Sequence, residues 1–274
     1  MQRRDFMSQT AGFGVVVAAA SLPVSLKGDA GFPGDTGKDL SNGVTDKLRP
    51  PQGAGGGARA TRDLSDGVID KLKPPAKGKI PVAFTISEDV TLIDFAGPWE
   101  VFQDVMVRER GADMEEQMPF ELFTVSGKTE PLTASAGLKL IPNYTFASAP
   151  EPRVVVVPAQ RGSAALHEWL RKVSKTADIT MSVCTGAFQL GKAGLLSGKS
   201  ATTHHDFLDQ LAKAFPDVTV KRGLRFVENE KISTAGGLSS GIDLALRVVD
   251  RYFGREVAQA TAAYMEYQSK GWIL

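Results

Sequence analysis

Cysteine and histidine are scarce in this chain: one cysteine, Cys184, and three histidines occur among 274 residues. A single cysteine excludes an intramolecular disulfide and the zinc sites that are built from several cysteines. His204 and His205 are adjacent, and neighbouring side chains of an extended segment point to opposite faces, so these two cannot readily chelate one ion. We therefore expect no metal site.

An excess of charge is also lacking, because 32 lysines and arginines stand against 31 aspartates and glutamates. This balance gives no overall reason to expect binding to nucleic acid or to an anionic membrane surface. Hydrophobic residues make up 42% of the chain and charged residues 23%. Such a composition is typical of a globular protein with one sizeable core.

The N-terminus has the features of a targeting segment. Arg3 and Arg4 precede Phe6, and residues 12–24 are rich in glycine, alanine and valine. This stretch is too short and too weakly apolar for a good transmembrane helix. It resembles a twin-arginine export signal, so we assign residues 1–27 to it and expect a periplasmic protein. No clear cleavage site follows, which leaves a membrane tether as an alternative to release.

Residues 28–78 are rich in glycine, proline, lysine and aspartate, and we interpret them as a linker. The segment 38–51 recurs as 62–75, and each copy could form a short helical turn that ends at a proline pair. Two interpretations remain: docking elements for a partner or for the folded domain, or a duplicated spacer. Helices this short are marginal in water, which favours the spacer.

From residue 79 to the end, short apolar runs alternate with helical patterns. The run Val154–Val157 is β-branched throughout, as expected of a central parallel strand buried on both faces. We predict an α/β domain over 79–274, with a doubly wound parallel sheet, helices on both faces and a small hairpin at 132–141. The expected strands are 80–86, 120–125, 154–158, 178–183, 200–204, 218–227 and 231–234, and the expected helices are 97–105, 163–175, 186–196, 207–215, 240–253 and 255–267.

Cys184 lies where the expected strand 178–183 turns into the expected helix 186–196. Such a turn lifts its residue above the sheet edge and points the free N–H groups of the helix's first turn toward it. The helix dipole favours a thiolate there, which makes Cys184 a candidate nucleophile. The alternative is a small buried apolar residue, a common role for a free cysteine. The position at the junction favours the nucleophile.

Sequence motifs in order along the chain resemble the DJ-1/PfpI superfamily, which is related to class I glutamine amidotransferases. They are DFAGPWEVF at 94–102, VCTGA at 183–187, ATTH at 201–204 and TAGGLSSGID at 234–243. The most similar branch is that of the isonitrile hydratases. The resemblance covers about residues 79–270 and implies a flavodoxin-like sheet, a cysteine at the nucleophile elbow, no cofactor and a homodimer.

The resemblance also implies roles for individual residues. Cys184 matches the elbow cysteine, Thr185 the threonine beside it, and Asp94 the acid that faces the thiol. His204 matches the histidine that follows the strand after the elbow helix. From the residues alone, Asp94 could instead cap the following helix, and His204 could be a core histidine with its polar atoms satisfied.

One segment departs from the family pattern. Many relatives carry a glycine pair after the third central strand, where backbone N–H groups form part of an oxyanion site. Here Pro158 is followed by Ala159, Gln160 and Arg161. Backbone donors could survive at Ala159 and Gln160, or the side chain of Gln160 or Arg161 could reach the pocket instead. The residues that we expect to bind substrate are Ala159, Gln160, Gly186 and Gly237.

These expectations lead to a small-molecule enzyme that hydrates an isonitrile to an N-substituted formamide through Cys184. One alternative is a glyoxalase or deglycase acting on α-oxoaldehydes with the same thiol. Another is an exported binding or sensor protein of the same fold that performs no turnover. A cysteine peptidase is disfavoured, because Thr185 occupies the position where those relatives place a histidine.

Overall fold

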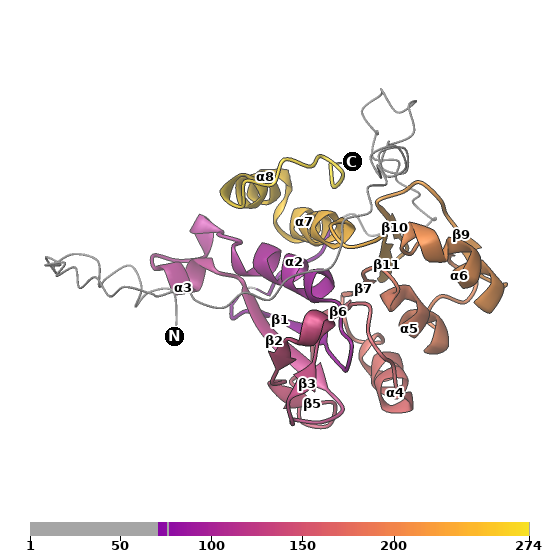
Figure 1. The fold of residues 1–274 in the computed structure, drawn as a ribbon. Coiled ribbons are helices and arrows are strands. Elements are labelled where there is room, and N and C mark those ends of the chain that lie inside the picture. The colour runs from indigo at the N-terminus through magenta and orange to yellow at the C-terminus, as the bar shows by residue number, and fades with distance from the viewer. Residues whose placement is uncertain (1–70, 76, 274) are drawn as a thin grey trace, which may run out of the picture. The chain divides into compact units, whose positions relative to one another are not determined.

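The central sheet has seven strands in the order β10-β11-β7-β6-β1-β2-β5 (Figure 1). All neighbours pair in parallel except β10 and β11, which are antiparallel. The strands are β1 (Ile80–Thr85), β2 (Phe120–Ser126), β5 (Tyr144–Thr145), β6 (Val154–Val157), β7 (Ile179–Ser182), β10 (Phe226–Glu228) and β11 (Ile232–Ala235). This topology confirms the predicted doubly wound α/β fold.

This computed structural model describes residues 71–75 and 77–273, which all belong to one compact unit at 54–274. The expected export signal, and all but the last residues of the repeat, lie outside the described residues. Within the described part of the chain, no helix is long and apolar enough to cross a membrane.

Helices cover both faces of the sheet (Figure 1). One face carries α2 (Leu92–Gln103) and α7 (Ser240–Phe253), with α8 (Arg255–Tyr264) packed against α7. The other carries α4 (Ala164–Val173), α5 (Gly186–Lys192) and α6 (Leu208–Ala214). The shorter elements are α3 (Met114–Gln117), three 3₁₀ turns at 108–110, 135–137 and 205–207, the antiparallel pair β3 (Leu132–Thr133) and β4 (Lys139–Leu140), and the parallel pair β8 (Ser200–Ala201) and β9 (Thr219–Val220).

Strand β6 explains why the sheet needs helices on both sides. All of its residues are fully buried, and successive side chains alternate between the two cores. Val154 and Val156 belong to the core beneath α2 and α7, and Val155 and Val157 to the core beneath α4 and α5. A continuous β-branched run is therefore the sequence pattern of a strand with no solvent-facing side.

Several boundaries differ from the sequence-based expectations. The first helix begins at Leu92 rather than at residue 97, so it contains Pro98 and places Asp94 in its first turn instead of at its cap. The expected strand 218–227 is two strands, β9 and β10, because Gly223 adopts a left-handed conformation (φ 71°) between them. The last helix ends at Tyr264, not at residue 267, and β8 ends at Ala201 rather than at residue 204.

The chain just before β1 lies against the folded unit. Leu72 packs on the apolar core, and its N–H donates to the carbonyl of Arg251 at 2.7 Å. The carbonyl of Lys73 accepts a hydrogen bond from Arg153 at 3.0 Å. These residues end the second copy of the repeat, so that end docks on the domain instead of acting as a free spacer.

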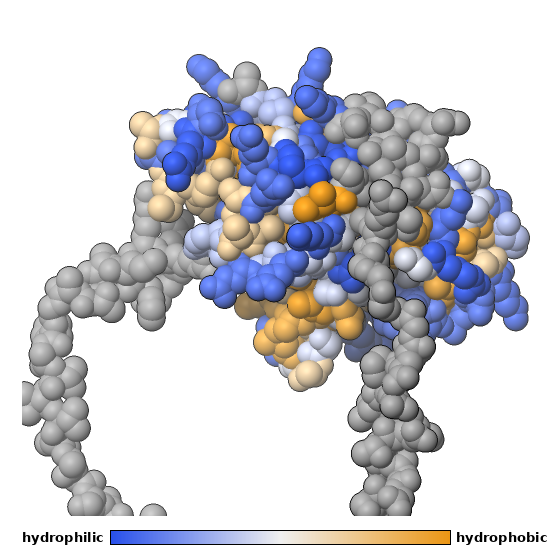
Figure 2. Space-filling model, turned by 90° about the horizontal axis from the view of Figure 1, so that it is seen from above, coloured by the Kyte–Doolittle hydropathy of each residue, from blue (hydrophilic) through white to orange (hydrophobic). Residues whose placement is uncertain are grey.

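On the face drawn in Figure 2, hydrophilic residues predominate and apolar residues gather in separate patches. The large side chains that are fully buried fill the two cores on either side of the sheet. The fold thus leaves the carboxyl ends of the strands as the region in which loops meet, and Asp94, Cys184 and His204 all follow strands there.

Candidate active site

Cys184 occupies a strained turn between β7 and α5. Its φ is 57°, a left-handed value that is uncommon for a residue with a side chain. The conformation is fixed on both sides: the Cys184 N–H donates to the carbonyl of Gly236 at 2.9 Å, and the Cys184 carbonyl accepts from the Thr203 hydroxyl at 2.8 Å. A strained backbone held in this way is typical of a nucleophile elbow.

The start of α5 requires glycine. A Cβ atom at Gly186 would lie 2.0 Å from the carbonyl oxygen of Val157, so no other residue could occupy the position without displacing β6. Gly186 is buried and lets the elbow approach the neighbouring strand. Its predicted contact with substrate stays a prediction, whereas its role in packing is evident.

Asp94, the predicted acid of the site, has a completely buried side chain. Its Oδ2 accepts a hydrogen bond from the N–H of Ala159 at 3.1 Å. Its Oδ1 makes no hydrogen bond of normal geometry within the described residues, although the Cys184 thiol is close enough to the carboxylate to lower its pKa. A buried carboxylate with such an oxygen can still accept a proton there.

The acid and the thiol influence each other's ionisation. Burial raises the pKa of Asp94 to about 6, although the hydrogen bond from Ala159 and the proximity of the Cys184 thiol both oppose this rise. Burial, and next the negative charge of Asp94, raise the pKa of Cys184 to about 11. At neutral pH the pair therefore holds one proton, which resides on sulfur, while the carboxylate is mostly ionised.

Two backbone N–H groups and one hydroxyl favour the ionised form of the thiol. The backbone and side chain of Thr185 and the backbone of Leu238 all lower the pKa of Cys184 against the larger effect of burial. Leu238 itself has a left-handed φ of 54°. Sequence reasoning missed Leu238, because it contributes through its backbone; the signal available was the TAGGLSSGID motif in which it lies.

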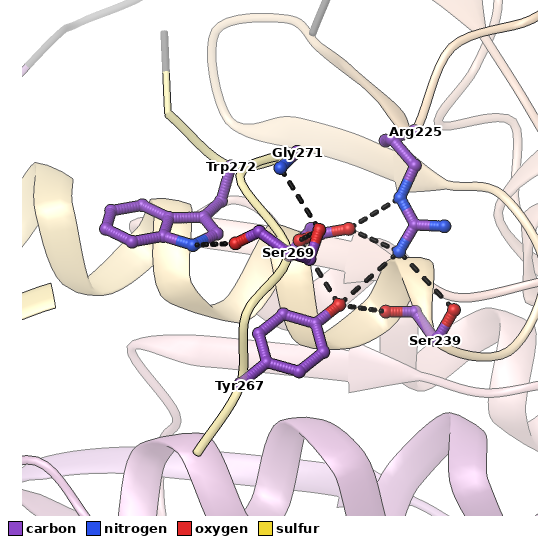
Figure 3. Close-up of polar contacts among 7 residues, drawn as sticks. Arg225, Ser239, Tyr267, Ser269, Gly271 and Trp272 are labelled. Atoms are coloured by element: carbon purple, nitrogen blue, oxygen red, sulfur yellow. Dashed lines mark hydrogen bonds and ion pairs between the residues drawn. The ribbon is translucent and has the colours of Figure 1, made fainter. Parts of the chain in front are cut away.

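The loop that carries Leu238 is held by polar contacts of Arg225, Ser239, Tyr267 and Ser269 (Figure 3), and the buried Asp243 is the common partner of all but Ser239. Asp243 on α7 forms an ion pair with Arg225 and accepts hydrogen bonds from Tyr267 at 3.2 Å and from Ser269 at 2.9 Å. The Tyr267 hydroxyl also donates to the carbonyl of Ser239 at 3.3 Å. The C-terminal segment thereby fixes the loop that supplies the N–H group at the thiol.

Of the two backbone donors expected after β6, the one at Ala159 already has a partner. The N–H of Ala159 is engaged by Asp94. The Gln160 side chain turns to β1, where its amide donates to the Thr85 hydroxyl at 2.7 Å, and Arg161 pairs with Asp89 at 2.6 Å. That one of these two side chains reaches the pocket stays a prediction, because both have other partners in this structure. Ala159 instead positions the acid.

His204 lies against the 236–240 loop. Its ring packs on Gly237, where a Cβ atom would lie 2.2 Å from the ring carbon Cδ2. Its Nδ1 accepts from the N–H of Asp206 at 3.3 Å. Beside it is a pocket of about 320 Å³ lined by residues 202–205, 208, 223–225 and 236–240. The structure thus brings Asp94 and Thr185 to the thiol and places His204 and Gly237 at this pocket.

The adjacent histidines do not point to opposite faces, contrary to expectation. The rings of His204 and His205 are stacked, with centroids 4.3 Å apart. The extended segment ends at His204 (ψ 137°), and His205 enters a 3₁₀ turn at 205–207. The alternation of side chains applies only within a continuing strand, so this turn brings both rings to one side.

The model of the DJ-1/PfpI family matches residues 81–251, which contain the elbow and the acid. The chain belongs to this family. Its similarity to an isonitrile hydratase from Pseudomonas putida extends over 197 residues at 32% identity, covering 69% of this chain and 78% of that enzyme. The DJ-1/PfpI match and this relative agree with the predicted superfamily and branch.

Other relatives are not enzymes by name. The HTH-type transcriptional regulator CdhR of Pseudomonas aeruginosa is 31% identical over 132 residues, which cover 48% of this chain and 35% of the regulator. Among solved structures, a THiJ/PfpI family protein from Pseudomonas syringae superimposes with a TM-score of 0.61 at 25% identity, covering 76% of this chain and 83% of that one. DJ-1/PfpI membership alone therefore leaves the reaction open.

Proposed function

We propose that this protein hydrates an isonitrile to an N-substituted formamide, with Cys184 as nucleophile and Asp94 as the proton carrier. The geometry that carries the proposal is the strained cysteine elbow beside a completely buried carboxylate, and the raised pKa values of both groups agree with one shared proton. Adding S–H across one carbon atom requires a group that takes the thiol proton and returns it nearby. The similarity to an isonitrile hydratase supports the choice of substrate.

In the first step, the sulfur of Cys184 attacks the terminal carbon of R–N≡C while Asp94 accepts the thiol proton. Asp94 then delivers that proton to the same carbon, which gives the thioimidate R–N=CH–S–Cys. The N–H of Leu238 and the hydroxyl of Thr185 stabilise negative charge on sulfur as the proton leaves.

In the second step, water adds to the thioimidate carbon and a proton reaches the nitrogen. The tetrahedral intermediate R–NH–CH(OH)–S–Cys then breaks its C–S bond. The hydroxyl proton returns to sulfur through Asp94, which releases R–NH–CHO and restores the starting thiol. Every atom of the isonitrile and of one water molecule appears in the product, and no electrons are exchanged.

The surroundings favour a substrate with an uncharged apolar substituent. Ile93, next to the acid, is 42% exposed, and Leu238, next to the thiol, is 45% exposed. Apolar side chains at the edge of a site gain free energy when they cover an apolar ligand group. An alkyl isonitrile has such a group and a carbon atom narrow enough to reach a buried thiol.

The test is a formamide assay on the purified full chain with several alkyl isonitriles at pH 7, followed by NMR of the formyl proton. We expect wild type to form the formamide and Cys184→Ser to form none. Methylglyoxal in a parallel assay tests the α-oxoaldehyde alternative. Turnover of methylglyoxal without hydration of any isonitrile would show that the site catalyses the α-oxoaldehyde reaction and would overturn the isonitrile proposal.

A second candidate function is a sensor that binds a small molecule without turnover, and it is supported by the regulators among the relatives. Calorimetry with the same isonitriles separates the two. Heat of binding without formamide would establish a sensor, and formamide formation would exclude a purely sensory role.

We also propose that the protein is exported through its N-terminal segment, as the Arg3–Arg4 pair before an apolar stretch supports. Fractionation of cells that produce the full chain tests this. Replacement of both arginines by lysine should retain the protein in the cytoplasm, and an unchanged distribution would contradict the twin-arginine route.

A further inference from the structure

Three consecutive residues bring potential metal ligands together at the rim of the pocket beside His204. They are His204, His205 and Asp206, and one ligand atom from each lies within 4.8 Å of the other two. Two of them, His204 and His205, also line the pocket of about 320 Å³. The proposed hydration uses none of these groups.

The potential ligand atoms of the three side chains lie close together. Nδ1 of His204 lies 3.7 Å from one oxygen of Asp206, and Nε2 of His205 lies 3.1 Å from the other. Nitrogen and oxygen ligands about 2.0–2.1 Å from a tetrahedral zinc ion are about 3.3 Å apart. The stacked rings of His204 and His205 must separate before both nitrogens face one ion, and the exposed His205 side chain has the room to move.

The backbone explains this proximity. His204 precedes the 3₁₀ turn at 205–207 and is held in place, because its ring packs on Gly237. His205 and Asp206 extend from the turn into solvent, with side chains 80% and 66% exposed. One ligand is therefore preorganised, and the other two can adjust to an ion at little cost in packing.

His204 presents the correct nitrogen. Its Nδ1 is an acceptor, because it receives the N–H of Asp206 at 3.3 Å. A neutral imidazole that accepts a hydrogen bond at one nitrogen has the lone pair that a metal needs there. Binding of an ion would replace this long hydrogen bond, and the exposed N–H of Asp206 could then bond to water.

We propose that His204, His205 and Asp206 form a binding site for a divalent transition-metal ion, with zinc as the best match. Two imidazoles and one carboxylate are a ligand set suited to zinc and its neighbours rather than to calcium or magnesium. Zinc held by three protein groups keeps one position for water or an external ligand. The adjoining pocket has room for such a ligand.

The site would also act on the segment behind the thiol. Thr203 precedes His204 and donates its hydroxyl hydrogen bond to the carbonyl of Cys184. An ion that fixes His204 therefore stabilises the folded state around the elbow without touching the sulfur. Because the three ligands are consecutive, the unfolded chain also keeps them near one another, so the ion raises the melting temperature only to the extent that the folded segment binds it more tightly.

The experiment measures zinc binding to the untagged full chain by equilibrium dialysis and by the shift in melting temperature. The chain contains only three histidines and one cysteine, so the controls are complete. We expect one zinc ion per chain. His205→Ala and Asp206→Asn should each weaken binding by about tenfold or more, and neither exposed residue is needed for folding.

Two further variants identify the ligands. His167→Ala removes the remaining histidine, which hydrogen-bonds to Gln189, and Cys184→Ser removes the thiol. Both should bind zinc as wild type does. Loss of binding in Cys184→Ser would place the ion at the thiol and overturn the proposal, as would unchanged affinity in His205→Ala or an absence of zinc binding to wild type.

Discussion

Two buried aspartates of this protein differ in how many polar partners they have. Asp94 and Asp243 are both completely inaccessible to solvent, and each lies in the first turn of a helix on the same face of the sheet. Asp243 has an arginine, a tyrosine and a serine as partners, whereas Asp94 has one backbone N–H and an oxygen with no partner in the described chain. One acid is fully satisfied and the other is not.

The difference separates structural from chemical roles. A buried carboxylate normally needs a cation or several donors, since burial of an unpaired charge is costly. The fold provides these for Asp243, which holds the loop beside the thiol. Asp94 has no cation and only one backbone donor among the described residues, and burial raises its pKa to about 6. Its carboxylate lies close to the Cys184 thiol. Leaving Asp94 unpaired lowers the stability of the folded state, but it gives the site a group that can exchange a proton near neutral pH.

The largest predicted effect is on activity. Asp94→Asn keeps the size of the side chain but cannot accept the thiol proton, so isonitrile hydration should fall by about 10²–10⁴-fold. The measurement is kcat/KM for formamide formation. Glu100→Gln, an exposed substitution on the same helix, is the matched control and should retain full activity. Comparable rates in Asp94→Asn and the control would remove Asp94 from the mechanism.

The next largest effect is on stability, at the satisfied acid. Arg225→Ala leaves Asp243 buried without its cation and should cost about 3–5 kcal/mol of unfolding free energy. Arg222→Ala breaks the exposed pair with Asp209 and should cost less than about 1 kcal/mol. Urea unfolding of both variants checks the contrast, and similar losses would show that burial does not distinguish the two ion pairs.

A smaller effect of opposite sign is expected at Asp94. Because its pKa rises from 3.8 to about 6 on folding, the folded state binds this proton more tightly, and stability falls as the pH rises from about 4 to about 6. Asp94→Asn should therefore gain on the order of 2–3 kcal/mol at pH 7 and little at pH 4. Unfolding at both pH values measures this gain, and a loss at pH 7 would contradict the unpaired charge.

The smallest effect concerns the hydroxyl that joins the C-terminal segment to the loop. Tyr267→Phe removes the hydrogen bonds to Asp243 and to the carbonyl of Ser239. Because Asp243 keeps Arg225 and Ser269, the cost should be only about 1 kcal/mol. Thermal unfolding measures it, with Tyr264→Phe at an exposed site as the control. Equal stability of the two variants would show that the hydroxyl contributes nothing.

Much of this arrangement could be predicted from sequence, because it depends on the type and order of side chains. The lone cysteine between a strand and a helix predicted the elbow, and the DFAGPWEVF motif predicted the acid. The β-branched run at Val154–Val157 predicted a central strand, because only a strand buried on both faces needs apolar residues at every position.

The rest depends on backbone geometry, which the pattern of side chains does not reveal. Leu238 acts through its N–H, and Ala159 positions Asp94 through its own. The stacking of His204 on His205 depends on a change of backbone conformation between two residues that were expected to continue a strand. In each case the side-chain type gives no hint of the contact.

The shared proton of Cys184 and Asp94 is tested most directly by the pH dependence of Cys184 alkylation with iodoacetamide in wild type and Asp94→Asn. In wild type we predict slow alkylation at pH 7 that accelerates only as the pH approaches about 11, because the thiol is protonated. In Asp94→Asn the curve should shift to lower pH, since the negative charge that disfavours the thiolate is gone. Rapid alkylation of wild type at pH 7, with the same profile in the variant, would contradict a thiol whose proton is governed by Asp94.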